Sequence, residues 1–283
     1  MNINKVFFGF RKWALVTGAA SGMGCIYARR LALMGYNIVM VDINQKGLER
    51  TEEMVKAAVS SSETITAAQK EQFRIFSLVQ DLSVKEAADI IHAKTEETGC
   101  EVEVLVNNAG IMYCQAIHAT SERALSLIMM VHMYTPMMLC RKYVGSMRDI
   151  GCGYILNISS LASWMIWPGI GMYGSTKRFV MDYSRELRIE CLKTGVSVTN
   201  AYFGAVDTPL IPLKESLRKL ARVLAVMIDP EKAVDKALKA TFNRRKGVMP
   251  GLLNKIFKPL CMIMPDCLLG WIYRKAAPYL MKV

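Results

Sequence analysis

The sequence lacks the common metal-binding patterns. None of its eight cysteines forms a C-x-x-C pair, and its three histidines (His92, His118 and His132) form no H-x-H or H-E-x-x-H cluster. We therefore predict no metal site. Scattered cysteines of this kind are typical of a reducing compartment, where buried thiols pack as small apolar groups.

Long uninterrupted hydrophobic runs are also missing. The apolar stretch 13–20 is short and contains Gly18, so it does not resemble a signal peptide. Near the C-terminus, Asp266 separates the apolar segments 259–265 and 267–273. Neither approaches the roughly 20 residues needed to cross a bilayer. We expect no transmembrane helix and a cytoplasmic location.

Acidic residues are in the minority, with 24 Asp and Glu against 36 Lys and Arg, for a net charge of +12. Residues 244–283 contain eight basic residues and one acid, a net +7. A basic and apolar C-terminus favours peripheral contact with a membrane surface or another anionic partner. The sequence carries no RNA- or DNA-binding motif, which argues against nucleic acid as a partner.

What the chain does contain is a globular composition, with 52% hydrophobic residues, 21% charged residues, 19 Gly and 9 Pro. These proportions exclude a disordered or collagen-like chain. A chain of 283 residues can bury a core that needs neither disulfides nor metal.

Short β-branched runs alternate with longer amphipathic stretches, which is typical of a parallel sheet with crossover helices. Several predicted strands are apolar throughout, as strands covered on both faces are. We predict a single doubly wound α/β domain over residues 1–243 and a short helical C-terminal extension over 244–283. The predicted strands are 13–17, 38–41, 73–78, 102–106, 154–158 and 196–201, and the predicted helices are 22–34, 45–60, 84–98, 121–147 and 172–194.

A glycine-rich turn follows the first strand, where residues 17–24 read T-G-A-A-S-G-M-G. Glycines let the backbone approach a pyrophosphate closely, and the N-terminus of the following helix attracts it. Directly after a buried strand, this turn predicts a dinucleotide site formed by Gly18, Ser21, Gly22, Met23 and Gly24.

The second strand ends at Asp42, 18 residues after Gly24. A carboxylate there accepts hydrogen bonds from an adenosine ribose and repels a 2′-phosphate. Ile43 follows, where an Arg would hold that phosphate, so we predict NAD, with NADP the less favoured cofactor. Two alternatives stay open: Asp42 could simply cap the next helix, and Lys46 could bind a 2′-phosphate.

Together with the glycine turn, three further motifs stand in order along the chain: Asp81-Leu82, Asn107-Asn108-Ala109-Gly110, and Y-x-x-x-K from Tyr173 to Lys177. With the turn, they resemble the short-chain dehydrogenase/reductase family over about residues 10–210. The resemblance implies a Rossmann domain that contacts adenine through Asp81 and Leu82. It implies further cofactor contacts from Asn108, Ala109, Gly110, Tyr173 and Lys177.

Tyr173 and Lys177 stand four residues apart, so they share one side of a helix. A Tyr has an unperturbed pKa of about 10, and a nearby Lys ammonium would lower that pKa towards neutrality. Tyr173 could then exchange a proton with an alcohol or ketone. The resemblance implies that Lys177 holds the nicotinamide ribose and that Ser160, 13 residues before Tyr173, binds the substrate oxygen. The alternative is a solvated helix face.

Two positions depart from the family pattern. His132 stands where the family usually has an Asn, and we assign it to the catalytic group, acting through its backbone carbonyl at a helix kink or by relaying protons through its ring. Alternatively, it only packs beneath the site. Residues 203–208 read F-G-A-V-D-T where the family often has P-G-x-V-x-T. Val206 and Thr208 keep their places as implied contacts of the nicotinamide.

Three loops at the carboxyl edge of the sheet, 111–113, 162–170 and 209–224, are rich in Trp, Met, Ile and Leu and contain no Arg clamp. They predict a hydrophobic small-molecule substrate, unless these residues pack the core or an oligomer face. The family resemblance favours a hydroxysteroid dehydrogenase-like oxidoreductase that transfers hydride between NAD(H) and a secondary alcohol or ketone, with a hydroxysteroid or bile acid as substrate.

Two other functions stay open. One is an NADPH-dependent reductase of a long-chain keto-lipid, resembling a 3-ketosphinganine or 3-ketoacyl reductase. The other is a catalytically silent dinucleotide-binding regulator. Family habit implies a homodimer or homotetramer formed through the helices at 121–147 and 172–194. The extension could lie on a membrane, cover the substrate loop or contact a neighbouring subunit.

Overall fold

The computed structural model describes residues 9–164, 166, 169–208, 227–251, 254, 256, 259 and 262–280. Its centre is a parallel sheet of seven strands in the order β3-β2-β1-β4-β5-β6-β9. The strand order reverses beside β1, so β1 and β4 diverge at a switch point where this class of fold binds its ligand. The predicted doubly wound α/β fold is confirmed.

The strands of the sheet are β1 (Trp13–Thr17), β2 (Asn37–Asp42), β3 (Ile75–Val79), β4 (Val102–Asn107), β5 (Gly153–Ser160), β6 (Val196–Phe203) and β9 (Gly247–Val248). A separate short pair joins β7 (Ala205–Val206) to β8 (Met227–Ile228). The helices are α1 (Gly22–Leu33), α2 (Gln45–Ser61), α3 (Ala67–Gln72), α4 (Ala87–Glu97), α5 (Glu122–Met129), α6 (Thr135–Ile150), α7 (Gly171–Glu190), α9 (Pro230–Phe242) and α11 (Asp266–Leu280).

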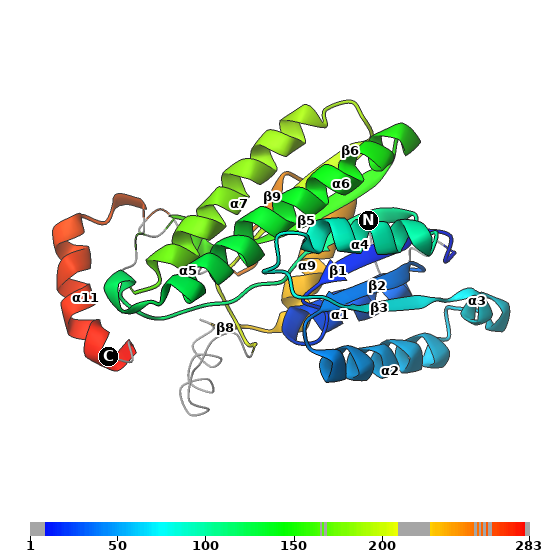
Figure 1. Ribbon diagram of the computed structural model, residues 1–283, viewed down its shortest axis with the longest axis horizontal. Helices are drawn as coiled ribbons and strands as arrows, with labels where there is room; N and C mark the ends of the chain where they lie inside the picture. The colour runs from blue at the N-terminus through cyan, green and yellow to red at the C-terminus, as the bar shows by residue number, and fades with distance from the viewer. Residues whose placement is uncertain are drawn as a thin grey trace.

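Two helical layers cover the sheet, as Figure 1 shows. Successive strand residues point to opposite faces, so Val16 of β1 packs in the core under α1, α2 and α9. Its neighbour Leu15 packs in the other core, under α4, α6 and α7. The apolar runs in the strands thus reflect burial on both faces.

The structure differs from the predicted elements in several places. The single helix predicted over 121–147 is divided into α5 and α6 by a π-helical turn over Met130–Tyr134. Helices α3 and α9 were not predicted. The start of α9 could have been recognised from the sequence, because Asp229 caps this helix and Pro230 is its first residue. Strand β9 was also missed, and it pairs with β6 from beyond the predicted boundary at residue 243.

Within the described residues, one continuous helical stretch, Glu122–Ile150, is long and apolar enough by composition to cross a membrane. Its second half buries Leu139, Tyr143 and Met147 against the sheet. These side chains make that half a core helix of the domain.

Candidate active site

The glycine turn packs as closely as its sequence predicts. Gly18 and Gly22 have positive φ angles of 68° and 57°, which favour glycine. A Cβ atom on Gly24 would lie 1.9 Å from the carbonyl oxygen of Gly18. Helix α1 begins at Gly22, and the side chain of its N-cap residue Ser21 makes no capping hydrogen bond. The turn therefore packs the N-terminus of α1, which is the positive end of the helix dipole, against the backbone of Gly18. Together they form a cradle that suits a pyrophosphate.

Asp42 lies beside this turn at the end of β2. Its carboxylate accepts hydrogen bonds from the N–H groups of Ala20, at 3.0 Å, and Asn44, at 2.9 Å. The cap of α2 is Asn44, whose side chain accepts from the N–H of Gly47. The alternative in which Asp42 caps that helix is therefore wrong. Lys46 is exposed in the first turn of α2.

The predicted adenine pair follows β3. The Asp81 carboxylate accepts from both the backbone N–H and the hydroxyl of Ser83, at 2.8 and 2.7 Å. Leu82 is buried, and its carbonyl accepts a hydrogen bond from the Thr135 hydroxyl at 2.7 Å. The pair is thus fixed in position at the edge of the sheet next to Asp42.

The motif after β4 is tied to the glycine turn through Thr17. The Thr17 hydroxyl accepts from the backbone N–H groups of Asn108 and Ala109, both at 3.1 Å. The Asn108 amide donates back to the carbonyl of Thr17 at 2.9 Å. Thr17 was not among the site residues predicted from the sequence. Its position at the end of β1 could have indicated a role there, because ligands of this fold bind at the carboxyl ends of the strands. Asn107 points elsewhere and donates to Asn157 at 2.8 Å.

The three predicted catalytic side chains come together from β5 and α7. Ser160 ends β5, accepts from the N–H of Ala162 at 3.1 Å, and has its hydroxyl near enough to the Tyr173 phenol to act on the pKa of that phenol. The Lys177 ammonium lies 5.8 Å from the centre of the Tyr173 ring. Ser159 points the other way and donates to the carbonyl of Lys177 at 2.8 Å, as strand alternation predicts.

The pKa of Tyr173 moves opposite to the prediction. Burial raises the pKa of its phenol, and the neighbouring Ser160 hydroxyl acts in the lowering direction. The Lys177 amine donates to the carbonyl of Ile158 at 2.9 Å, so it is not directed at the phenol. Burial also lowers the pKa of Lys177 to about 8. Desolvation therefore dominates at both groups.

His132 is buried, and both of its ring nitrogens have partners. Nε2 accepts from the backbone N–H of Ile111 at 2.9 Å, and Nδ1 lies 2.9 Å from the hydroxyl of Thr176. Because Nε2 accepts, the proton of the neutral ring is on Nδ1 and is donated to Thr176. That hydroxyl donates to the carbonyl of Tyr173 at 3.0 Å. His132 thus links the loop after β4 to the helix that carries Tyr173.

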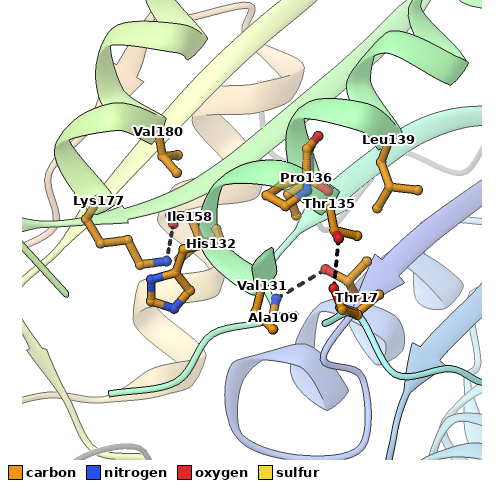
Figure 2. Close-up of a pocket in the computed structure, with 12 residues that line it drawn as sticks. Thr17, Ala109, Val131, His132, Thr135, Pro136, Leu139, Ile158, Lys177 and Val180 are labelled. Carbon is orange, nitrogen blue, oxygen red and sulfur yellow. Dashed lines mark hydrogen bonds between the residues drawn. The ribbon is translucent and has the colours of Figure 1, made fainter. Parts of the chain in front are cut away.

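The π-helical turn over Met130–Tyr134 contains His132, which lines one small cavity together with Lys177. Pro136, four residues later, has no N–H to donate to the His132 carbonyl. A cavity of about 10 Å³, room for one water molecule, lies there between His132, Pro136 and Lys177 (Figure 2). A Cβ on Gly110 would lie 3.2 Å from Nε2 of His132 and 3.6 Å from Nζ of Lys177. Gly110 therefore permits this close approach.

The remaining predicted contacts follow β6. Val206 is buried in the short strand β7, and Thr208 is buried two residues later, its N–H donating to the Val206 carbonyl at 2.8 Å. Of the predicted substrate loops, Trp164 packs against Tyr202 with ring centres 4.5 Å apart. Met165, Trp167 and the loop 209–224 lie outside the described residues. Among the described residues, no three His, Cys, Asp or Glu side chains gather as a metal site would require.

Residues 12–218 match the short chain dehydrogenase family. The chain belongs to this family. The match covers the glycine turn, Ser160, Tyr173 and Lys177, so the protein is an oxidoreductase of the family that acts on an alcohol or ketone.

Three similar proteins show how widely the relatives range. A fatty acyl-CoA reductase of Acinetobacter baylyi is 30% identical over 258 residues, 90% of this chain and 81% of that one. The 17-beta-hydroxysteroid dehydrogenase type 3 of Mus musculus is 28% identical over 204 residues, 70% of this chain and 61% of that one. The structure of a short-chain dehydrogenase from Sphingobium yanoikuyae in complex with NADPH has a TM-score of 0.72 at 21% identity, and the match covers 90% of this chain and 97% of that one. The last likeness confirms the fold.

Proposed function

We propose that this enzyme transfers hydride between NAD(H) and a secondary alcohol or ketone on a hydrophobic substrate, with a hydroxysteroid favoured. The observation that carries the proposal is the convergence of Ser160, Tyr173 and Lys177, with Lys177 lining one small cavity together with Thr17, the residue before the glycine turn. A silent regulator would have no need of this arrangement.

The residues present fit a dinucleotide. The cradle formed by Gly18, Gly22 and the start of α1 would hold the pyrophosphate, and Asp42 would hold the adenosine ribose. Lys177 would hold the nicotinamide ribose. When bound, the nicotinamide supplies or accepts the hydride.

The protein's own residues handle the proton. In the reducing direction, Ser160 and Tyr173 donate hydrogen bonds to the ketone oxygen and hold it in place. Tyr173 then gives its phenolic proton to the oxygen as negative charge develops there. A raised pKa suits Tyr173 to be the acid in this direction, because the phenol stays protonated at neutral pH. The Lys177 ammonium favours the phenolate that is left.

The preference for NAD rests on Asp42. Its carboxylate lies next to the glycine turn, where it would repel a 2′-phosphate. The neighbouring Ile43 is 64% exposed and carries no charge that could neutralise that phosphate.

Long-chain keto-lipid reduction is the second candidate. The likeness to a fatty acyl-CoA reductase over 90% of the chain supports it. The mouse hydroxysteroid dehydrogenase covers less of the chain but supports the first candidate. Either substrate is apolar, so the two proposals share one site and one chemistry.

One assay tests the proposal. The purified protein is given NADH or NADPH with a panel of ketosteroids and 3-keto-lipids, and cofactor oxidation is followed at 340 nm, the wavelength at which the reduced nicotinamide absorbs. We expect ketosteroid turnover with NADH, and a loss of about 10³-fold in kcat for Tyr173→Phe, which removes the proton donor. Ser163→Ala, which removes a neighbouring buried hydroxyl, is the matched control and should keep most of the activity.

Three results would count against parts of this proposal. Turnover confined to keto-lipids with NADPH would favour the second candidate. Full activity of Tyr173→Phe would exclude the mechanism. Cofactor binding without any turnover would favour a catalytically silent dinucleotide-binding regulator.

We also propose that α11 contacts an anionic membrane surface. Leu268 and Trp271 are 43% and 55% exposed on one side of this helix, and the exposed Arg274 and Lys275 follow them. Apolar side chains bordered by basic ones suit the interface of a bilayer. The proposed homodimer or homotetramer would use the outer sides of α5, α6 and α7, which light scattering would test.

A further inference from the structure

A second, larger cavity lies next to the catalytic helix. Its volume is about 400 Å³, and it is bounded by the loop after β4, by α5, by the start of α7 and by α11. Tyr113, Ile117, Leu125, Ile128, Met172 and Tyr273 supply most of its apolar wall. Pockets that bind small molecules are commonly about 300–1,000 Å³ and mostly apolar, so this cavity has the size and the chemistry of a ligand site.

The cavity adjoins the catalytic centre on two sides. Gly171 and Met172, which line it, directly precede Tyr173. Tyr113 lies two residues after Ile111, whose backbone N–H is held by His132. The two walls are joined where the N–H of Gln115 donates to the carbonyl of Gly169 at 2.9 Å. A substrate held at Tyr173 therefore has this cavity within reach of its other end.

The C-terminal helix supplies one wall. Leu269 of α11 is 7% exposed, and Tyr273, one turn later on the same side of the helix, lines the cavity. The opposite side carries the exposed Trp271. Figure 1 shows α11 beyond the end of α5, away from the sheet, so Tyr273 lines the cavity from its outer side.

We propose that this cavity binds the part of the substrate remote from the reacting carbon, and that Tyr273 of α11 helps to select substrates larger than a single ring. The proposal rests on the proposed function and narrows its substrate class to bulky apolar alcohols and ketones. Gln115 and Thr120 add polar atoms to the wall, which could receive a distant hydroxyl.

Two variants test the cavity from opposite walls. Ala116→Trp, in the loop, would fill it, and Tyr273→Ala would remove part of its outer wall. Initial rates with saturating NADH are compared for cyclohexanone and for the fused bicyclic ketone 2-decalone. We expect kcat/KM for 2-decalone to fall by about tenfold or more in both variants, mainly through KM, and that for cyclohexanone to change by less than about twofold. Trp271→Ala, on the exposed side of α11, is the matched control and should change neither.

The outcomes separate this inference from the proposed function. If the wild type reduces neither ketone nor any ketosteroid, the proposed function fails, and calorimetric titration of 2-decalone into the protein with NADH still tests the cavity. Binding of 2-decalone that is at least tenfold weaker in Ala116→Trp than in Trp271→Ala would support the inference about the cavity. If the wild type turns over both ketones, and the variants lose kcat/KM equally for both or lose it for neither, the inference is wrong.

Discussion

At the scale of single residues, the site depends on buried polar groups whose partners keep them in one protonation state. Burial and the nearby Lys177 lower the pKa of His132 well below its usual value of 6.5. Protonation of Nε2 would also break the hydrogen bond from Ile111. Both facts favour a neutral His132 that positions the loop and α7, and they argue against a proton relay through its ring.

This gives a prediction for stability against pH. His132→Ala should lower the free energy of unfolding at pH 7.5 by about 2–4 kcal/mol, because it leaves the Ile111 N–H without its acceptor and opens a cavity. Since the folded-state pKa is below the unfolded one, the stabilisation is complete above pH 6.5 and is lost as pH falls towards the folded-state pKa. The deficit of the variant should therefore shrink by up to about 1.4 kcal/mol per pH unit below 6.5, measured by urea unfolding.

His118→Ala is the control, because the side chain of His118 is exposed. A stability difference between wild type and His132→Ala that stays constant from pH 7.5 to 5 would contradict the neutral ring. A relay function would instead appear as a change in the acid limb of the kcat profile in His132→Gln.

At the scale of elements, the site depends on where chain segments approach too closely for a side chain. The start of α1 touches the carbonyl of Gly18, and the division between α5 and α6 brings His132 to Lys177. Such π-helical turns are frequent at functional sites. At the glycine turn and at the π-helical turn, the path of the backbone therefore sets how closely the site residues approach one another.

We expect Gly24→Ala to lower stability by about 1–3 kcal/mol and to weaken NADH binding by about tenfold or more, because its Cβ would overlap the carbonyl of Gly18 and force α1 away. Gly145→Ala, inside α6, is the matched control. A Cβ there meets nothing within 4 Å, so this change should stabilise by about 0.5–1 kcal/mol. Chemical denaturation and NADH fluorescence titration measure both effects, and equal behaviour of the two variants would refute the argument.

At the scale of the whole molecule, the C-terminal region has two sides with different roles. One side of α11 packs towards the domain through Leu269, and the other exposes Leu268 and Trp271 near Arg274 and Lys275. Combining the two proposals, an apolar substrate dissolved in a membrane would meet the enzyme beside its cavity.

Full-length protein should cosediment with vesicles containing phosphatidylserine more than with pure phosphatidylcholine, and less as salt increases, because screening weakens the attraction of the basic residues. Trp271→Glu should reduce this binding by about tenfold or more, since it puts a carboxylate into the apolar contact. Ile90→Glu, at an exposed apolar position on α4, is the control. Equal binding of both variants would exclude α11 as the contact.

The sequence alone was sufficient for the doubly wound fold, and it marked the glycine turn, Asp42 and the Tyr173–Lys177 pair as candidate site residues. Each of these follows from a local rule, since periodicity marks a strand or helix, and the end of a parallel strand marks the edge where ligands bind. The same local rules could have found α9, whose start is marked by Asp229 and Pro230.

Only the tertiary structure decided the direction of the Tyr173 pKa shift, the partners of His132 and the cavity that joins Tyr113 to Tyr273. Desolvation depends on every atom packed around a group. Two residues 160 positions apart that line one cavity leave no periodic pattern in the chain. Site residues that belong to a short motif can therefore be predicted from the sequence. Properties that depend on burial, such as a pKa shift or a cavity, are set only when the chain has packed.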